Sequence, residues 1–459
     1  MHKYFLVGAA LLTASIATAQ TPGRIQVSPN HHFLQYQDGR PFFWQGDTAW
    51  LLFERLDRAE TEQYLDNRQR KGFTVIQAML LHSANARSAS GVAALVENDP
   101  GRPNLPAGGY WDHVDWVVSQ AAARGMFVAM VPAWGSVVKG GQLNLGNVVA
   151  YATSLAHRYR DRPNVVWICG GDTPGDQNTE VWKKLGQTLK AEDPGHLITF
   201  HPFGRTQSSA WFHNEPWLDF NMFQSGHDRY DQDTTSPHRY GEDNWRYVQD
   251  DYARTPPKPV VDGEPSYEGI PQGLHDTTQP LWTDSGVRRY AYWSVFAGAF
   301  GHTYGDNAIM QFYRTGAAKG SYGPRKPWTE ALDDPGAGQM QFLKALMLSR
   351  PYFERVPDQS LIGHQPGTQH DFVLATRGAG YLLAYTATGR PIEIRMGAIS
   401  GERVQAWWYS PRDGSAQSIG TFDNRGMRTF SPPGQPGEGN DWVLVVDDVA
   451  RKFPPPGSR

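Results

Sequence analysis

The sequence has little of several features that would assign it to a common class of protein. Cys169 is its only cysteine, so neither an intrachain disulfide nor a zinc site with paired cysteines is available. Charge of one sign is not in excess: 43 Lys and Arg against 46 Asp and Glu give a net charge of −3, without the basic footprint of nucleic-acid binding. After the N-terminal 20 residues no stretch reaches the roughly 18 apolar residues of a membrane span, so no span is expected.

Motifs of metal, phosphate and nucleophilic-serine enzymes are missing as well. Histidines do not occur at the His-x-x-x-His spacing of many metal sites, so we expect no metal site. The segments 46–48 and 170–172 do not match a phosphate-binding loop, and no Gly-x-Ser-x-Gly elbow is present. We therefore expect chemistry that needs no cofactor.

What the sequence has in quantity is aromatic residues and glycine: 16 Trp, 20 Tyr, 21 Phe and 48 Gly. Aromatic rings offer flat apolar faces, which match the C–H faces of sugar rings. A large core could also use many of these rings. Together with the weak net charge, this composition favours a protein that binds or processes carbohydrate.

The N-terminus has the three regions of a secretory signal peptide. His2 and Lys3 form a short positive region, residues 4–16 an apolar region, and Ala17-Thr18-Ala19 a small-x-small cleavage site. We therefore predict that residues 1–19 are a signal peptide cleaved after Ala19. The form of the signal suits a bacterial protein that is periplasmic or secreted.

Between about residues 40 and 310, short apolar runs alternate with helical stretches, the pattern of a parallel sheet with crossover helices. Helices are predicted at 58–71 (capped by Asp57), 110–124, 147–159 and 179–192. The predicted strands are 42–46, 75–80, 126–132, 165–170, 197–201, 220–224, 260–263 and 297–302. Eight such units fit a (β/α)8 TIM barrel of the α/β class, which typically takes about 250 residues. We assign residues 20–356 to this barrel, including an N-terminal hairpin at about 25–39.

After about residue 355 the pattern changes to alternation with a period of two, which predicts antiparallel strands. A linker is expected at 357–367 and a C-terminal antiparallel β-sandwich at 368–450. The last residues, 451–459, are expected to be disordered. The predicted strands are 372–377, 381–386, 392–396, 403–409 and 442–446.

In a TIM barrel the active site is formed by the loops that follow the carboxyl ends of the strands. Polar or aromatic residues follow every predicted strand, and packing alone does not explain why they converge on one face. The candidates for substrate contact are Asp47, Trp50, His82, Trp134, His201, Gln224, Tyr267 and His302.

Two carboxylates follow strands that lie nearly opposite across a small barrel: Asp172 ends the fourth strand and Glu264 the seventh. Glycoside hydrolysis uses one carboxyl group to protonate the leaving oxygen and another to attack the sugar or to activate water. The placement is similar to that of the largest superfamily of retaining glycosidase barrels, which implies Asp172 as acid/base and Glu264 as nucleophile. That superfamily has Asn-Glu where this chain has Gly171-Asp172, and Asp is one methylene shorter.

Each candidate also has a structural alternative. Asp172 could cap the turn that follows it, and Glu264 could pair with Arg288 or Arg289. Asp47 could anchor the base of the site instead of binding sugar hydroxyls. The two tryptophans could pack in the core, and each histidine could orient the carboxylates or serve a structural role.

Five segments together resemble glycoside hydrolase family 140, the apiosidases: 43–50 (FWQGDTAW), 167–172 (WICGGD), 262–268 (DGEPSYE), 297–305 (AGAFGHTYG) and 406–414 (AWWYSPRDG). The resemblance runs over essentially the whole mature chain. It implies a catalytic barrel with Asp172 and Glu264 as the catalytic pair, followed by a domain of the kind labelled collagen-binding. It also implies release of a terminal β-apiofuranosyl residue, which the family removes from galacturonate of pectic rhamnogalacturonan II.

Two other functions stay open at this point. One is a related glycosidase that acts on arabinofuranosides or galactosides, because furanoside pockets differ by few contacts. The other is a non-catalytic glycan-binding protein that has kept a barrel. In each case the expected partner is a plant cell-wall oligosaccharide rather than nucleic acid or a membrane.

Overall fold

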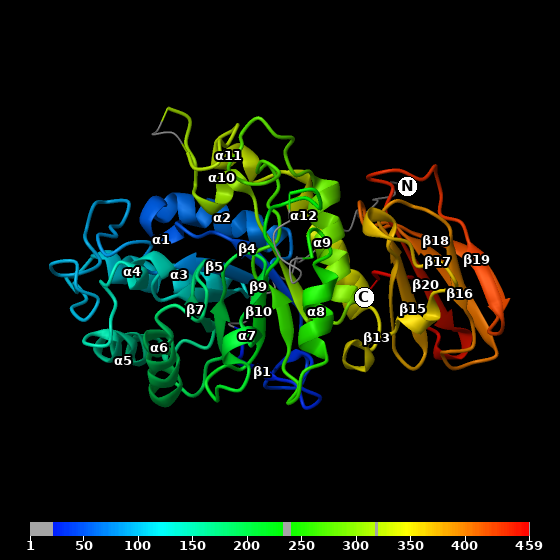
Figure 1. Ribbon diagram of the computed structural model, residues 1–459, viewed down its shortest axis with the longest axis horizontal. Helices are drawn as coiled ribbons and strands as arrows, with labels where there is room; N and C mark the ends of the chain where they lie inside the picture. Colours follow the sequence, from blue (N-terminus) through cyan, green and yellow to red (C-terminus); the bar gives the residue numbers. More distant parts are fainter. Residues whose placement is uncertain (1–21, 233–239, 317–319, 459) are drawn as a thin grey trace, which may run out of the picture.

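The computed structural model describes residues 22–232, 240–316 and 320–458, which form an α/β barrel and a second, antiparallel domain beside it (Figure 1). The predicted signal peptide lies outside the described residues. Within them, no helix is both long and apolar enough to cross a membrane.

The barrel confirms the predicted fold. Its eight parallel strands, counted within the described residues, are β4 (Trp44–Thr48), β5 (Val75–Met79), β6 (Phe127–Val131), β7 (Val165–Gly170), β8 (Ile198–His201), β10 (Asn221–Gln224), β11 (Val260–Asp262) and β12 (Gly301–Tyr304). A short strand, β9 (Thr206–Gln207), adds to β10 in the antiparallel sense. Between β8 and β10 the barrel is nearly closed, because the Asp219 N–H donates to the Ile198 carbonyl at 2.9 Å and the Thr199 hydroxyl to the Phe220 carbonyl at 2.7 Å.

The strands are predictable because parallel strands buried on both faces appear as continuous apolar runs. Every residue of β5, β6 and β7 is buried, and each lies within one or two residues of its predicted bounds. The first and last strands begin later than predicted. The predicted strand 297–302 starts instead at Gly301, because Ala297 ends a helix and Gly298 turns the chain with φ +126°.

Helices cover the barrel and lead into its loops. At the start of α2, Asp57 forms the expected cap: its carboxylate accepts the Glu60 N–H at 2.9 Å, and Glu60 in turn accepts the Asp57 N–H at 3.0 Å. The helices of this part are α1 (Leu52–Arg55), α2 (Arg58–Arg70), α3 (Tyr110–Ala123), α4 (Gly135–Lys139), α5 (Val148–Tyr159), α6 (Thr179–Glu192), α7 (Ser209–Phe212), α8 (Trp245–Tyr252), α9 (Asp284–Phe296), α10 (Asn307–Met310), α11 (Trp328–Ala331) and α12 (Pro335–Leu348).

The N-terminal hairpin predicted at 25–39 is present and gains a third strand. β1 (Ile25–Val27) pairs with β2 (Leu34–Tyr36), which pairs with β3 (Pro41–Phe42). Phe42 and Tyr36 meet edge to face, and Phe42 packs against Phe127 of β6. The hairpin therefore covers the amino-terminal end of the barrel, opposite the predicted site.

Within residues 320–458 the second domain has two sheets. The larger has the order β13 (Val356–Pro357), β14 (Leu374–Arg377), β15 (Tyr381–Thr386), β20 (Trp442–Asp448), β17 (Arg403–Tyr409), β18 (Ala416–Asp423), and the smaller pairs β16 (Ile392–Arg395) with β19 (Met427–Phe430). β18 and β19 were not predicted, because they carry few apolar residues and only one of their residues, Phe430, is buried.

Both faces of the larger sheet are buried. One face packs against the smaller sheet and the other against the barrel, so this sheet joins the two parts of the molecule. Leu382 and Ala384 of β15 point into the core between the two sheets, whereas Leu383 and Tyr385 belong to the same hydrophobic cluster as the barrel. Tyr385 stacks on Tyr292 of α9 at a ring distance of 4.9 Å. Figure 1 shows α9 and α12 between the barrel strands and this sheet.

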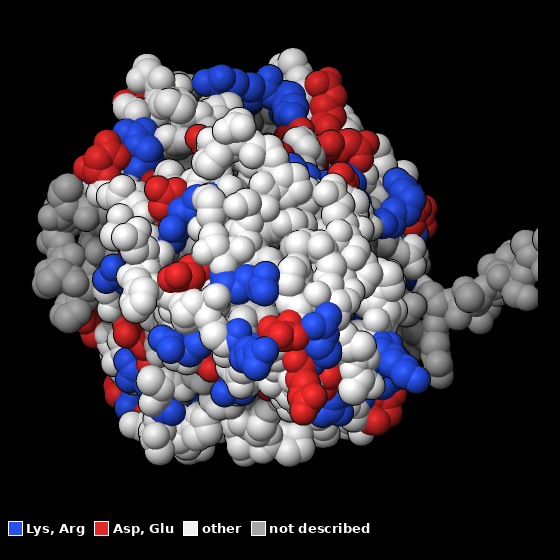
Figure 2. All heavy atoms as spheres, turned by 90° about the vertical axis from the view of Figure 1, so that its right-hand side faces the viewer, with Lys and Arg blue, Asp and Glu red and all other residues white. Residues whose placement is uncertain are grey.

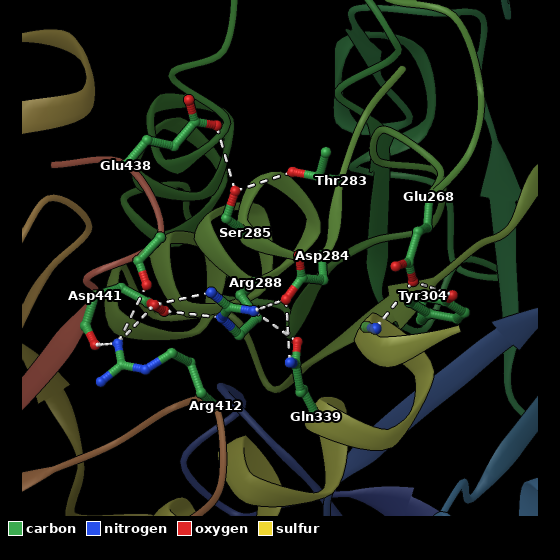
Figure 3. A network of polar contacts seen from close by, with 12 residues as sticks. Glu268, Thr283, Asp284, Ser285, Arg288, Tyr304, Gln339, Arg412, Glu438 and Asp441 are labelled. Atoms are coloured by element: carbon green, nitrogen blue, oxygen red, sulfur yellow. Dashed lines mark hydrogen bonds and ion pairs between the residues drawn. The ribbon is translucent and has the colours of Figure 1, made fainter. Parts of the chain in front are cut away.

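Buried ion pairs cross the same interface. Arg288 of α9 donates from Nε and Nη2 to the two carboxylate oxygens of Asp441 at 3.0 and 2.9 Å, and Arg412 contacts Asp441 from the other side (Figure 3). Arg350 pairs in the same bidentate way with Asp447, at 2.8 and 2.7 Å. The outer end of the second domain carries both signs of charge interspersed around a broad uncharged area (Figure 2).

Two segments expected to be loose are packed. The expected linker 357–367 includes a residue of β13, and Leu361 within it lies in the sandwich core. In the expected disordered tail, Phe453 lies under the Arg350 guanidinium and the Gly457 N–H donates to Ser349 Oγ at 3.2 Å. The polar and proline-rich composition of these segments does not reveal such contacts, which are made with residues distant in sequence.

Candidate active site

A cavity of about 580 Å³ opens at the carboxyl ends of the barrel strands. Its walls come from the loops after β4, β5, β6, β7, β8, β10, β11 and β12, as the strand-end pattern predicts. Of the residues predicted from the sequence, it is lined by Trp50, His82, Trp134, Asp172, Gln224, Glu264 and Tyr267.

Glu264, two residues after β11, is 8% exposed and lies between two histidines. His227 Nε2 is 3.1 Å from its Oε1, and His201 Nε2 is 3.2 Å from its Oε2. Burial alone would raise the pKa of Glu264, but the two histidines beside its carboxylate, His201 and His227, lower it to about 2. The carboxylate is therefore ionised and held in a fixed orientation.

Asp172 stands on a loop whose backbone only glycine can form easily. Gly170 and Gly171 have φ values of +88° and +110°, and Asp172 itself has φ +50°. A Cβ atom on Gly170 would lie 2.4 Å from the His201 carbonyl oxygen, and one on Gly171 would lie 2.4 Å from the Trp134 ring. The left-handed turn carries Asp172 over the carboxyl end of the barrel and into the cavity.

The electrostatics of Asp172 are opposite to those of Glu264. Enclosure by the cavity walls raises the pKa of Asp172, and the negative charge of Glu264 raises it further; the nearby histidines and a hydrogen bond with Gln224 act in the other direction. Asp172 does not cap the next helix, α6, which begins only at Thr179. The cavity thus holds one carboxylate that favours ionisation and one carboxyl that favours its proton.

The His201 ring lies between the Glu264 carboxylate and the backbone of Asp172. His201 Nδ1 lies 3.1 Å from the Pro202 carbonyl oxygen and 3.4 Å from the Asp172 backbone nitrogen, and Nε2 on the other side of the ring lies 3.2 Å from Glu264 Oε2. His201 itself is fully buried beneath the cavity. We expected it to contact substrate, but its place indicates that it orients Glu264.

Aromatic side chains form one wall. Trp50 Nε1 donates to the Tyr267 hydroxyl at 3.1 Å, and the Trp50 and Trp134 rings lie 5.1 Å apart. The Tyr267 ring also meets the His227 ring edge-on at 4.7 Å. Trp134 is partly exposed, so its ring can offer a face to a sugar, whereas Trp50 is 4% exposed.

His82 lies at the rim on the loop after β5. Its backbone N–H donates to Glu54 Oε1 at 3.3 Å. Burial lowers the pKa of its ring, and the charge of Arg55 lowers it further. A neutral His82 ring can both donate and accept a hydrogen bond, as sugar hydroxyls require.

Asp47 lies outside the cavity lining formed by the described residues, contrary to the predicted substrate contact. Its carboxylate is fully buried and pairs with Arg68 Nε at 2.7 Å and with the Tyr64 hydroxyl at 2.5 Å. Both partners come from α2. Asp47 therefore has a structural role: it holds α2 against β4 and does not contact substrate.

His302 is also placed elsewhere than predicted. It lies inside the barrel on β12, 3% exposed, paired in register with Gln45 and Asp262. Burial lowers the pKa of its ring to about 3, so the ring is neutral. It is a core residue of the barrel.

The structural alternative for Glu264, pairing with arginine, does not occur. Arg288 pairs with Asp441 and Arg289 with Glu242. A neighbouring acid, Asp262, is fully buried, and burial raises its pKa to about 7. It accepts hydrogen bonds from Ser225 and Asn244, so it has a buried structural role.

The structure adds site residues that sequence reasoning missed. His227 contacts Glu264 but follows β10 by three residues, and its position was not distinguished from that of the other histidines. The cavity is also lined by Arg55, Tyr322 and an ion pair between Arg205 and Asp228. Their only signal is proximity to strand ends, which many other polar residues share.

Across residues 22–232, 240–316 and 320–458, no group of three or more His, Cys, Asp or Glu side chains is arranged to hold a metal ion. The carboxylates and histidines of the cavity contact each other instead. The arrangement suits acid–base chemistry with a nucleophile in one pocket.

Comparison with known proteins agrees with this chemistry. A family profile described as "Apiosidase-like, catalytic domain" matches residues 28–354, and one described as "Putative collagen-binding domain of a collagenase" matches residues 356–447. A solved structure of a glycoside hydrolase shares 48% identity over 94% of this chain and 98% of its own, with a TM-score of 0.91. A glycoside hydrolase family 5 structure from Bacteroides vulgatus shares 46% identity over 95% and 96%, with a TM-score of 0.92.

A more distant relative is the mannan endo-1,4-beta-mannosidase F of Aspergillus fumigatus, 24% identical over 231 residues. This chain spans about half of that relative's length, 52%, and 40% of this chain is matched. The catalytic-domain profile, in contrast, covers most of this chain. The chain belongs to the apiosidase-like family and is a glycoside hydrolase.

Proposed function

We propose that the enzyme releases a terminal β-apiofuranosyl residue from rhamnogalacturonan II or a related plant glycan, with retention of configuration. Membership of the apiosidase-like family supports the sugar. The observation that carries the mechanism is the pair of carboxyl groups in one cavity whose pKa values are shifted in opposite directions.

In this mechanism Asp172 gives its proton to the leaving oxygen while the Glu264 carboxylate attacks the anomeric carbon. The bond from sugar to leaving group breaks and a glycosyl ester to Glu264 forms. Asp172, now ionised, takes a proton from a water molecule, which attacks the anomeric carbon. This releases the sugar and restores both groups to their starting states. The histidines that flank Glu264 keep its carboxylate ionised and oriented.

Arg55 supports a leaving-group sugar that carries a carboxylate. Its guanidinium lines the cavity, is exposed, and has no ion-pair partner among the described residues. The other arginine of the cavity, Arg205, is paired with Asp228. A guanidinium can bind a carboxylate through two parallel hydrogen bonds, and a carboxylate is what distinguishes galacturonate from galactose.

We also propose that the enzyme is exported to the periplasm or secreted. The support is the sequence of residues 1–19, with a positive start, an apolar middle and a small-x-small end. Export places the enzyme where large plant glycans are accessible.

A panel of substrates tests the proposal. Fragments of rhamnogalacturonan II that end in apiosyl-galacturonate are compared with aryl β-apiofuranoside, aryl α-arabinofuranoside, aryl β-galactoside and β-mannan. We expect apiose to be released, with the β-anomer formed first when the product is followed by NMR. Release of arabinose, galactose or mannose in place of apiose would show that the proposed sugar is wrong. Formation of the opposite anomer first would show that the enzyme inverts the configuration.

The same panel tests Arg55. The wild-type preference for the apiosyl-galacturonate fragment over its carboxyl-reduced form is measured as a ratio of kcat/KM. Arg55→Gln should reduce that ratio about 10- to 150-fold, since a charge-assisted hydrogen bond contributes about 1.5–3 kcal/mol. An unaltered ratio would mean that Arg55 does not bind the carboxylate of galacturonate.

A further inference from the structure

The loop between β10 and α8 begins at the active site and ends at the second domain. At its start, His227 contacts Glu264, and Asp228 pairs with Arg205 on the cavity wall. At its end, Glu242 is 2% exposed and lies beside the second domain. The described residues of this loop are 225–232 and 240–244.

Glu242 contacts three parts of the molecule: the second domain, α9 and the start of the loop. Its Oε2 lies 2.8 Å from Nε2 of His370, a residue of the second domain, and also pairs with Arg289 of α9. Its Oε1 accepts the backbone N–H of Tyr230 at 3.4 Å. Tyr230 follows His227 by three residues, so one buried carboxylate links the second domain to the catalytic end of the loop.

Neighbouring contacts hold the same region. The Tyr230 hydroxyl donates to Asp243 Oδ1 at 2.5 Å, and its ring packs against the His370 ring at 5.6 Å. Phe372 of the second domain stacks on Trp245, the first residue of α8, with ring centroids 4.4 Å apart and planes 6° from parallel. The short segment 370–372 therefore contacts both the loop and the helix that follows it.

We propose that His370 is a positioning residue for the active site: by holding Glu242 it fixes the loop that sets His227 against Glu264. The second domain is then part of the catalytic apparatus and not only a support for the barrel. The proposal rests on the proposed role of Glu264. A purely structural His370 would affect the stability of the protein and leave the kinetic constants of the folded enzyme as they are.

The test uses the full-length enzyme and the aryl glycoside of the panel that the wild type cleaves fastest. His370→Ala should lower kcat about 10- to 100-fold, the size of effect that a displacement of about 1 Å in a catalytic group can have. His370→Gln should restore much of the loss, because its amide can donate to Glu242. His364→Ala is the matched control, since His364 is an exposed histidine of the same domain.

Thermal midpoints are measured in parallel, and assays are run well below them. Should His370→Ala fold poorly, Glu242→Gln removes the same charge contact with little change of shape and should show the same loss of kcat. A lowered midpoint with kcat and KM equal to wild type overturns the proposal. Glu264→Gln, assayed beside them, separates the outcomes: if it stays active the role of Glu264 is wrong, whereas an inactive Glu264→Gln with a fully active His370→Ala overturns only the positioning role.

Discussion

The two carboxyl groups of the cavity differ because their surroundings differ. Glu264 is buried, yet two histidine Nε2 atoms at 3.1 and 3.2 Å keep it ionised. Asp172 faces the cavity on a left-handed turn and is influenced by the negative charge of Glu264. These opposite shifts in one pocket are the basis on which we propose Glu264 as the nucleophile and Asp172 as the acid.

This difference predicts the pH dependence of kcat/KM. Glu264 stays ionised down to about pH 2. Any loss of kcat/KM at acidic pH should therefore come from unfolding of the protein and not from protonation of Glu264. The pKa of Asp172 is raised, and the enzyme loses its acid as the pH rises through that pKa, so kcat/KM should fall on the basic side. The measurement is kcat/KM between about pH 3 and 9 with a poor leaving group. In Asp172→Asn the basic limb should disappear along with most of the activity, and a rate that increases with pH in the wild type would contradict the assignment.

At the scale of single residues, sequence reasoning located the catalytic candidates better than their surroundings. Asp172 and Glu264 were placed by counting strands, and both line the cavity. Asp47 and His302 were placed in the same way, but they lie within β4 and β12 and in the core, where neighbours from α2 and from the barrel interior enclose them. Whether a strand-end side chain faces the cavity or the core depends on packing between distant segments, which one sequence does not show.

At the scale of elements, the prediction succeeded where burial leaves a simple pattern. β7 and α6 were predicted with their observed bounds, the first as an apolar run and the second as an amphipathic helix. α9 was missed. Eleven of its 13 residues are buried, because the barrel packs on one side and the second domain on the other. A helix enclosed on both sides lacks the polar face by which helices are recognised.

At the scale of the whole molecule, the barrel and the second domain share one hydrophobic cluster. Alternate residues of β15 pack into the core of the second domain and into the core shared with the barrel. Buried ion pairs also connect the two domains. Such an interface is typical of parts that unfold together, not of a binding module on a flexible tether. The domain is therefore a fixed part of the enzyme, whatever its relatives bind.

Asp441→Ala tests this cooperativity. The substitution removes the bidentate partner of the buried Arg288, which keeps only its contacts with Asp284 and Gln339, so the free energy of unfolding should fall by about 3 kcal/mol. Unfolding in denaturant, followed by tryptophan fluorescence and circular dichroism, should remain a single transition in both proteins. Asp423→Ala is the control, since Asp423 pairs with Arg403 on the surface and its loss should cost at most about 1 kcal/mol. Two separate transitions in the wild type would show that the domains are independent.

The most direct test of the catalytic account is the kcat of Glu264→Gln on the substrate that the wild type cleaves. Glu268→Gln is the matched control, because Glu268 is a buried acid four residues further on that hydrogen-bonds Tyr304 away from the cavity. Glu264→Gln should lose at least about a thousandfold in kcat with a thermal midpoint near that of the wild type, whereas Glu268→Gln should keep most of the activity. A Glu264→Gln enzyme that retains a tenth or more of the wild-type kcat would contradict the account.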